Sequence, residues 1–142
     1  MLTGHLALSL AAAFAGAAFY IGFAEHPARL GLDDKNLLKQ WKPSYDAGYT
    51  MQASLAAASG ALGLLTAWLS QDWRWIPGAI LILANWPYTL IGIMPVNHKL
   101  KAIDESDAGP ASRSLLQTWA RLHSVRTLLG IAATSAYLWA LG

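Results

Sequence analysis

The sequence predicts an all-α integral membrane protein: a four-helix bundle with a short interfacial helix between helices one and two. Hydrophobic residues make up 55% of the chain and charged residues 13%, whereas a typical soluble domain is about 25% charged. Four apolar windows have the length of about 20 residues that a membrane-spanning helix needs. Nine of the ten lysines and arginines lie beside two of the three connections. The length of 142 residues predicts a single domain, residues 1–142.

The four apolar windows cover residues 2–24, 47–69, 76–94 and 118–141. The first is predicted to be a retained helix rather than a cleaved signal peptide, because no lysine or arginine precedes it and the run is long. The short turn at residues 70–72 makes the second and third helices antiparallel neighbours, and tryptophans flank it as interfacial aromatics do. Small residues should let the first two helices approach closely: Ala12, Gly16, Ala56, Gly60 and Gly63.

The two long connections carry their own signals. Asp33 is a candidate N-cap and Pro43 a candidate stop, which predicts a short helix over 33–42 in the membrane surface. Its apolar residues, Leu38 and Trp41 among them, should face lipid or the mouth of the bundle. The connection 98–114 is typical of a solvated loop, in which Ser112 could cap the last helix.

Charge and composition narrow the partners and the localisation. The positive-inside rule places the first and third connections in the cytoplasm and both termini outside, in a plasma or inner membrane. The net charge of +2, without any basic run, excludes nucleic acid as an expected partner. The absence of cysteine excludes disulfides, cysteine zinc sites and thiol catalysis. Expected partners are membrane lipid and a small apolar substrate, and a homo-oligomer or larger membrane complex is compatible with the small-residue helix faces.

The last helix points to a candidate site. Only 16 residues follow Arg126, about 24 Å of helix against a hydrocarbon core of about 30 Å. To span that core, the helix must draw Arg126 and His123 to its edge or inside. Trp119, His123 and Arg126 are spaced by 4 and 3 residues, so they form one stripe. A charged arginine there should face the interior and find a partner, with Glu25 as the expected one.

Simpler interpretations remain open for these residues. Arg126 could snorkel to lipid phosphate, and His123 could be a satisfied interior histidine. A metal site from His26, His98 and His123 is an alternative, although the sequence lacks a His-x-x-x-His or Glu-x-x-His pair. Asn85 most simply serves the helix defect that Pro87 creates two residues later.

Three motifs resemble those of a known family. The first helix ends in Glu25-His26-Pro27-Ala28-Arg29, and Pro95-Val96-Asn97-His98-Lys99-Leu100 follows the third. The fourth opens with Trp119-Ala-Arg-Leu-His123-Ser-Val-Arg126. Together they resemble the anthrone-oxygenase-like family of four-helix integral membrane proteins, over nearly the whole chain. Its named members are cofactor-independent monooxygenases that convert anthrones to anthraquinones, so the resemblance implies no cofactor.

The anthrone chemistry suits the residue types at the candidate site. Proton removal from carbon needs a base with a pKa near the working pH, which suits His123 or, as second candidate, His26. The resulting oxyanion needs donors in a water-poor site, which suits Arg126 and Asn97. A flat ring needs aromatic faces. The candidate substrate-binding residues are Trp119, Trp86, Tyr88, Arg29 and Gln52.

The competing hypothesis is a non-catalytic membrane subunit that binds a quinone, a lipid or haem, or packs in a larger complex. Haem or metal binding through His26 and His123 would show as colour or bound metal in the purified protein. The two classes differ in what surrounds His123. An enzyme needs an opening there that is wide enough for a planar ligand, whereas a packing subunit should be filled.

Overall fold

The computed structural model describes residues 1–142 and contains helices without strands. They form four rods, because short α and π segments follow one another with little interruption. The first rod contains α1 (Leu2–Tyr20), the π turn η1 (Ile21–Glu25) and α2 (His26–Arg29), and the second is α3 (Asp34–Ser70). The third contains α4 (Trp75–Leu83), α5 (Asn85–Tyr88), the π turn η2 (Thr89–Ile93) and α6 (Met94–Ala102). A 3₁₀ turn, η3 (Glu105–Asp107), leads to the fourth rod, α7 (Pro110–Leu141).

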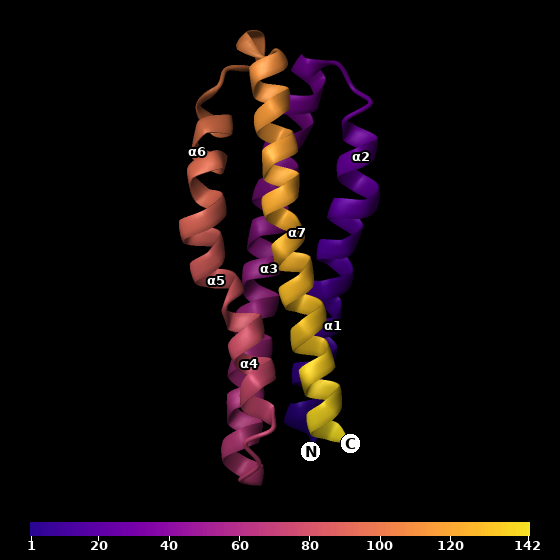
Figure 1. Cartoon of the computed structure of the whole chain (residues 1–142), viewed down its shortest axis with the longest axis vertical. Coiled ribbons are helices and arrows are strands. Elements are labelled where there is room, and N and C mark those ends of the chain that lie inside the picture. Colours follow the sequence, from indigo (N-terminus) through magenta and orange to yellow (C-terminus); the bar gives the residue numbers. More distant parts are fainter.

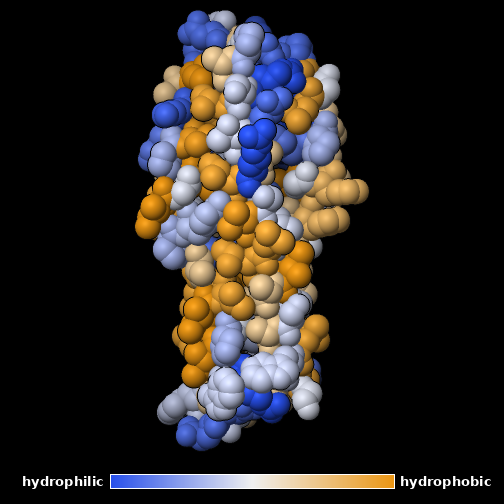
Figure 2. Space-filling model, in the orientation of Figure 1, coloured by the Kyte–Doolittle hydropathy of each residue, from blue (hydrophilic) through white to orange (hydrophobic).

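The rods form an elongated antiparallel bundle (Figure 1). Both termini and the α3–α4 turn lie at one end, and the two other connections lie at the opposite end, as the charge pattern predicted. Figure 2 shows a hydrophobic band between hydrophilic ends on the face in view. Three rods, Leu2–Arg29, Asp34–Ser70 and Trp75–Ala102, are long and apolar enough to cross a membrane. Because α7 is not among them, the fourth membrane span remains a prediction.

The predicted interfacial helix does not exist as a separate element. Residues 34–42 are the first turns of α3, which continues through Pro43. Leu37, Leu38 and Trp41 are fully buried in the bundle rather than turned to lipid. A proline inside a helix costs about 3 kcal/mol, but burying each leucine returns about 1.5–3 kcal/mol. Packing therefore holds this segment in line with the rest of α3.

The helices also extend further than predicted at their ends. Asp33 is the N-cap of α3, as predicted, and accepts a hydrogen bond from the Asn36 N–H at 3.0 Å. The hydrogen bonds from Asn36 hold the pKa of Asp33 below its usual value. The expected solvated loop over 98–114 shrinks to residues 103–109, because α6 reaches Ala102 and α7 begins at Pro110. Ser112 lies inside α7 and accepts a hydrogen bond from the Gly109 N–H at 3.0 Å.

Two apolar cores fill the bundle, one near each end. The core near the termini includes Phe14, Ile82 and Tyr137. The core at the opposite end includes Trp41, Leu100 and Trp119. Between these two cores, three of the rods carry buried polar residues. These are Gln52 on α3, Asn85 and Thr89 on the third rod, and His123 and Arg126 on α7. The bundle therefore has a buried polar layer between its two apolar cores.

Close helix packing near the termini depends on glycines, which yields a first prediction. A Cβ at Gly63 would collide with the Tyr137 hydroxyl, which donates to the Ser59 carbonyl at 3.1 Å. We expect Gly63→Ala to destabilise the protein by about 1–3 kcal/mol through overpacking, measured as a lower unfolding midpoint in detergent. Gly16 is exposed with nothing near its Cβ position, so Gly16→Ala should leave the midpoint unchanged or raise it. Equal midpoints for the two variants would contradict the packing described here.

Candidate active site

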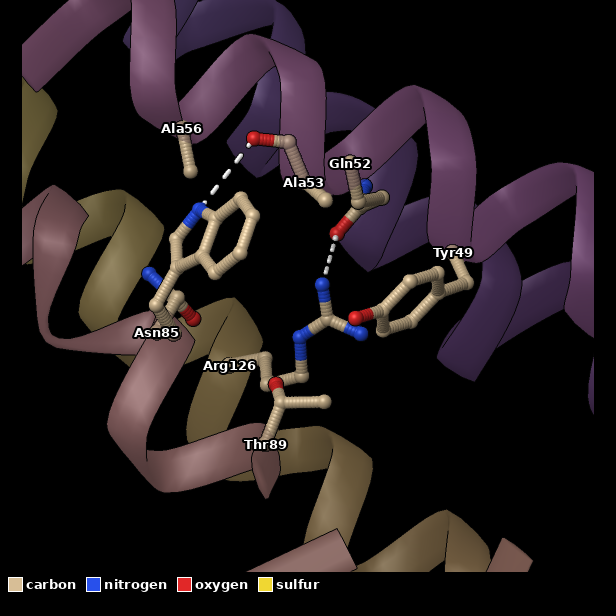
Figure 3. Close-up of a pocket in the computed structure, with 8 residues that line it drawn as sticks. Tyr49, Gln52, Ala53, Ala56, Asn85, Thr89 and Arg126 are labelled. Atoms are coloured by element: carbon tan, nitrogen blue, oxygen red, sulfur yellow. Dashed lines mark hydrogen bonds between the residues drawn. The ribbon is translucent and has the colours of Figure 1, made fainter. Parts of the chain in front are cut away.

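Arg126 is the central residue of the polar layer. It is only 6% exposed, and its nearest hydrogen-bond acceptor is the Gln52 side-chain oxygen at 3.4 Å. Figure 3 shows the guanidinium lying between Gln52 and Tyr49. On another side it lies 5.6 Å from the centre of the Phe14 ring. Arg126 takes part in none of the four ion pairs of the protein, so this buried cation has no carboxylate partner.

The predicted partner of Arg126, Glu25, bonds to other residues, and so does Asn97. Glu25 pairs with Arg29, one helical turn further along the same rod, and accepts a hydrogen bond from Ser44. Asn97 donates to the Tyr45 hydroxyl at 2.6 Å. The prediction that Arg126 contacts Glu25 is therefore wrong, and Asn97 does not bond to Arg126 either. The physical reason is competition, since Arg29 lies four residues from Glu25 on the same helical face.

One ring nitrogen of His123 makes a hydrogen bond, and the other has no hydrogen-bond partner. Its Nε2 lies 3.0 Å from the carbonyl oxygen of Ala18. A carbonyl can only accept, so Nε2 carries the proton and Nδ1 keeps a lone pair. Nδ1 is buried without a hydrogen-bond partner. The ring stacks on Trp119 with centroids 5.1 Å apart and planes 18° apart. This arrangement fixes the orientation and the tautomer that a general base requires.

His26 lies against Trp119 too, with ring centroids 5.2 Å apart. It is 2% exposed, and neither of its ring nitrogens has a hydrogen-bond partner. It does not line either cavity of the polar layer. His98 is exposed on α6. No three His, Cys, Asp or Glu side chains converge as metal ligands, so His26, His98 and His123 do not form the ligand cluster of the metal alternative.

Arg126 lines two small cavities. The first, called here the inner cavity, has a volume of about 20 Å³ and reaches His123, Trp119, Arg29 and Tyr45. The second has a volume of about 10 Å³ and reaches Asn85, Trp86 and Thr89 (Figure 3). Gln52, Tyr49 and Arg126 line both. A volume of this size holds about one water molecule. The expected opening wide enough for a planar ligand is therefore not present in this conformation.

The remaining predicted substrate-binding residues divide between the cavities and the surrounding structure. Arg29 lines the inner cavity and lies 5.9 Å from the centre of the Trp119 ring. Trp86 lines the smaller cavity and donates to the Ala53 carbonyl at 3.3 Å. Tyr88 donates to the Leu122 carbonyl at 2.7 Å and lines neither cavity. Asn97 also stands outside both cavities, behind Tyr45.

Two tyrosines of the site were not among the predicted site residues. Tyr49 lines both cavities, and Tyr45 lines the inner one. A sequence signal for them exists. Tyr45, Tyr49 and Gln52 are spaced by 4 and 3 residues, the same spacing as Trp119, His123 and Arg126 on α7. This spacing places the residues of each set on one face of their helix.

The sequence of the chain is similar to those of a known protein family. The sequence profile of the anthrone oxygenase family matches residues 41–136, more than half of the chain. The chain belongs to the anthrone oxygenase family. A curated anthrone oxygenase from Claviceps purpurea (strain 20.1) is 28% identical over 141 aligned residues, which cover 89% of this chain and 81% of that protein. No solved structure matches the chain.

The part of the chain that matches the anthrone oxygenase family contains the whole of the polar layer. Residues 41–136 include Gln52, Tyr49, His123 and Arg126, together with Trp119, Trp86, Tyr88 and Asn97. His26 and Arg29 lie outside the matched residues. The match to the anthrone oxygenase family thus covers the residues of α3 and α7 that form the two facing stripes of the inner cavity. It does not cover the first rod, where the Ala18 carbonyl accepts a hydrogen bond from His123.

Proposed function

We propose that this protein is a membrane-embedded, cofactor-independent monooxygenase that oxidises an anthrone or a similar apolar aromatic ketone. The observation that carries the proposal is Arg126, a buried guanidinium facing a cavity without a carboxylate partner. Placing an arginine in a membrane helix costs about 2.5–3.5 kcal/mol at the bilayer centre on insertion scales, and less near the surface. Such a cost is expected at a functional site, and an oxyanion formed during the reaction is the charge that Arg126 complements.

The proposed reaction begins with proton transfer from carbon. The methylene carbon of the anthrone opposite its carbonyl loses a proton to His123 Nδ1, and the bonding electrons move into the ring system to give an enolate. The negative charge rests on the former carbonyl oxygen, where Arg126 stabilises it and Gln52 holds the guanidinium in place. The lone pair on Nδ1 and the fixed ring of His123 support this assignment.

Dioxygen then reacts with the electron-rich enolate at the deprotonated carbon. Electron transfer and bond formation give a hydroperoxide after the proton returns to oxygen. Loss of water, with cleavage of the O–O bond and of the remaining C–H bond, leaves a second carbonyl. One anthrone and one dioxygen thus give one anthraquinone and one water. The face of Trp119, stacked on His123, suits the flat ring of such a substrate.

The test is oxidation of anthrone by the purified protein in detergent micelles. We expect oxygen consumption and anthraquinone formation in equal amounts, at a rate above that of protein-free micelles. Spectra and metal analysis of the same sample report any bound haem or metal. A rate equal to that of the protein-free micelles would contradict the proposal.

A second candidate is a non-catalytic membrane subunit that packs in a larger complex. The small volume of the inner cavity, about 20 Å³, favours it, since a packing subunit needs no space for a ligand beside His123. Absence of both anthrone oxidation and 9,10-anthraquinone binding would support this candidate over the enzyme.

A further inference from the structure

A surface groove runs between the first rod and α3, directly outside the inner cavity. Its volume is about 320 Å³, and five of its lining residues do not line the inner cavity: Ala17, Tyr20, Glu25, Ala47 and Met51. Pockets for small molecules usually measure about 300–1,000 Å³, so the groove, unlike the inner cavity, has room for a fused aromatic ring system. Called here the α1–α3 groove, it is the larger of the two spaces on this side of the bundle.

The α1–α3 groove and the inner cavity share one wall. Three residues line both spaces: Ile21, Ser44 and Gly48. Ser44 is fixed, because it donates to Glu25 and accepts from Arg29 at 3.1 Å. Gly48 has no side chain, and a Cβ there would lie 3.8 Å from the Ile21 Cδ1 atom. The side chain of Ile21 is thus the part of this wall that can move without breaking a hydrogen bond.

The backbone conformation at Ile21 supports its role as the movable part of the wall. Ile21 is the first residue of the π turn η1 and is half-buried. Single π turns inside helices interrupt the regular hydrogen-bond ladder and occur frequently at functional sites. On the opposite side of the wall stand His123, Arg126 and Trp119. A rotamer change of Ile21 would therefore join the α1–α3 groove to the reacting groups.

We propose that the planar aromatic substrate reaches the inner cavity through the α1–α3 groove, with Ile21 as the gate. The proposal rests on the proposed function for the identity of the substrate. It accounts for a catalytic cavity that is closed in this conformation. Opening between Ile21 and Gly48 admits the ring system edge-on, and Arg126 and His123 then meet it inside.

A second groove offers a rival route. It lies between the first rod and α7, has a volume of about 410 Å³, and is lined by Phe19, Gly22 and Phe23 among others. A Cβ at Gly22 would lie 3.7 Å from the Cδ2 atom of His123. This groove shares no lining residue with the inner cavity. It also approaches the ring beside Nε2, the nitrogen already bonded to Ala18, rather than at Nδ1.

The first experiment measures occupancy and does not depend on turnover. The chain has no cysteine, so a single introduced thiol reports its own surroundings. We expect 9,10-anthraquinone to slow maleimide labelling of Ala47→Cys several-fold in detergent micelles. Ala58→Cys is the control, because Ala58 is exposed on the same face of α3 about three turns away. Equal effects at both thiols, or no effect at Ala47→Cys, would overturn the proposal even if the enzyme oxidises anthrone.

The second experiment measures the route in the working enzyme with anthrone as substrate. Gly48→Leu adds a side chain beside Ile21 that blocks the opening between the groove and the inner cavity. It should therefore lower kcat/KM by on the order of tenfold, with a smaller change in kcat. Ile21→Ala, which shortens the gating side chain, should raise kcat/KM. Gly16→Leu, at an exposed and open position of α1, is the control for adding a leucine. If Gly22→Leu lowers kcat/KM and Gly48→Leu does not, the substrate uses the α7 side and the proposal is wrong. If no variant or wild-type protein oxidises anthrone, the proposed function fails and the labelling result alone decides whether the groove binds the ring.

Discussion

Replacing His123 with glutamine is expected to lower kcat for anthrone oxidation by about 10²- to 10⁴-fold, the usual contribution of a general base. The glutamine amide can still donate to the Ala18 carbonyl, which His123 Nε2 contacts at 3.0 Å, but it has no basic nitrogen at the place of Nδ1. The measurement is the initial rate of oxygen consumption at saturating anthrone. Wild-type activity should fall at low pH as the base becomes protonated, and His123→Gln should lack this dependence.

His26→Gln is the matched control for the base. Both histidines are 2% exposed and both rings contact Trp119, so the two substitutions perturb similar surroundings. Only His123 lines the inner cavity. We therefore expect His26→Gln to retain most of the activity with an unchanged pH dependence. Loss of activity in His26→Gln, together with activity retained in His123→Gln, would assign the base to His26.

Replacing Arg126 with methionine is expected to have opposite effects on activity and on stability. The rate should fall by about 10²- to 10³-fold, the loss seen when one oxyanion donor is removed. The unfolding midpoint should rise or stay unchanged, because a buried cation without a carboxylate partner is replaced by an apolar side chain of similar length. Initial rates and thermal unfolding in the same detergent measure the two effects.

Two variants make the result for Arg126 interpretable. Arg126→Lys keeps the charge and should retain part of the activity, although lysine cannot reproduce the planar fork of the guanidinium. Arg121→Gln removes an exposed arginine of the same helix and should change neither quantity. A marked loss of stability in Arg126→Met would show that Arg126 supports the fold, which would remove the main argument for an oxyanion site.

Much of the architecture follows from local sequence signals. Apolar windows predicted the helices, and Asp33 was identified as an N-cap from its own sequence neighbourhood. The charge pattern predicted the shared end of the two long connections. The 4 and 3 spacing of Trp119, His123 and Arg126 placed them on one buried stripe. Each of these features depends on residues within a few positions of one another, where helix geometry alone relates sequence to space.

The partners of the polar residues depended on the tertiary structure. Arg126 meets Gln52, 74 residues away, and His123 meets the carbonyl of Ala18, 105 residues away. Arg29 competes for Glu25, and packing of Leu37 and Leu38 carries α3 through Pro43. The volume of the inner cavity likewise depends on side chains from three rods. The sequence by itself therefore determined which residues share a helical stripe and lie inside, because periodicity is local. Only the tertiary structure decided which stripes face each other and how closely, because contact between distant segments depends on packing of the whole bundle.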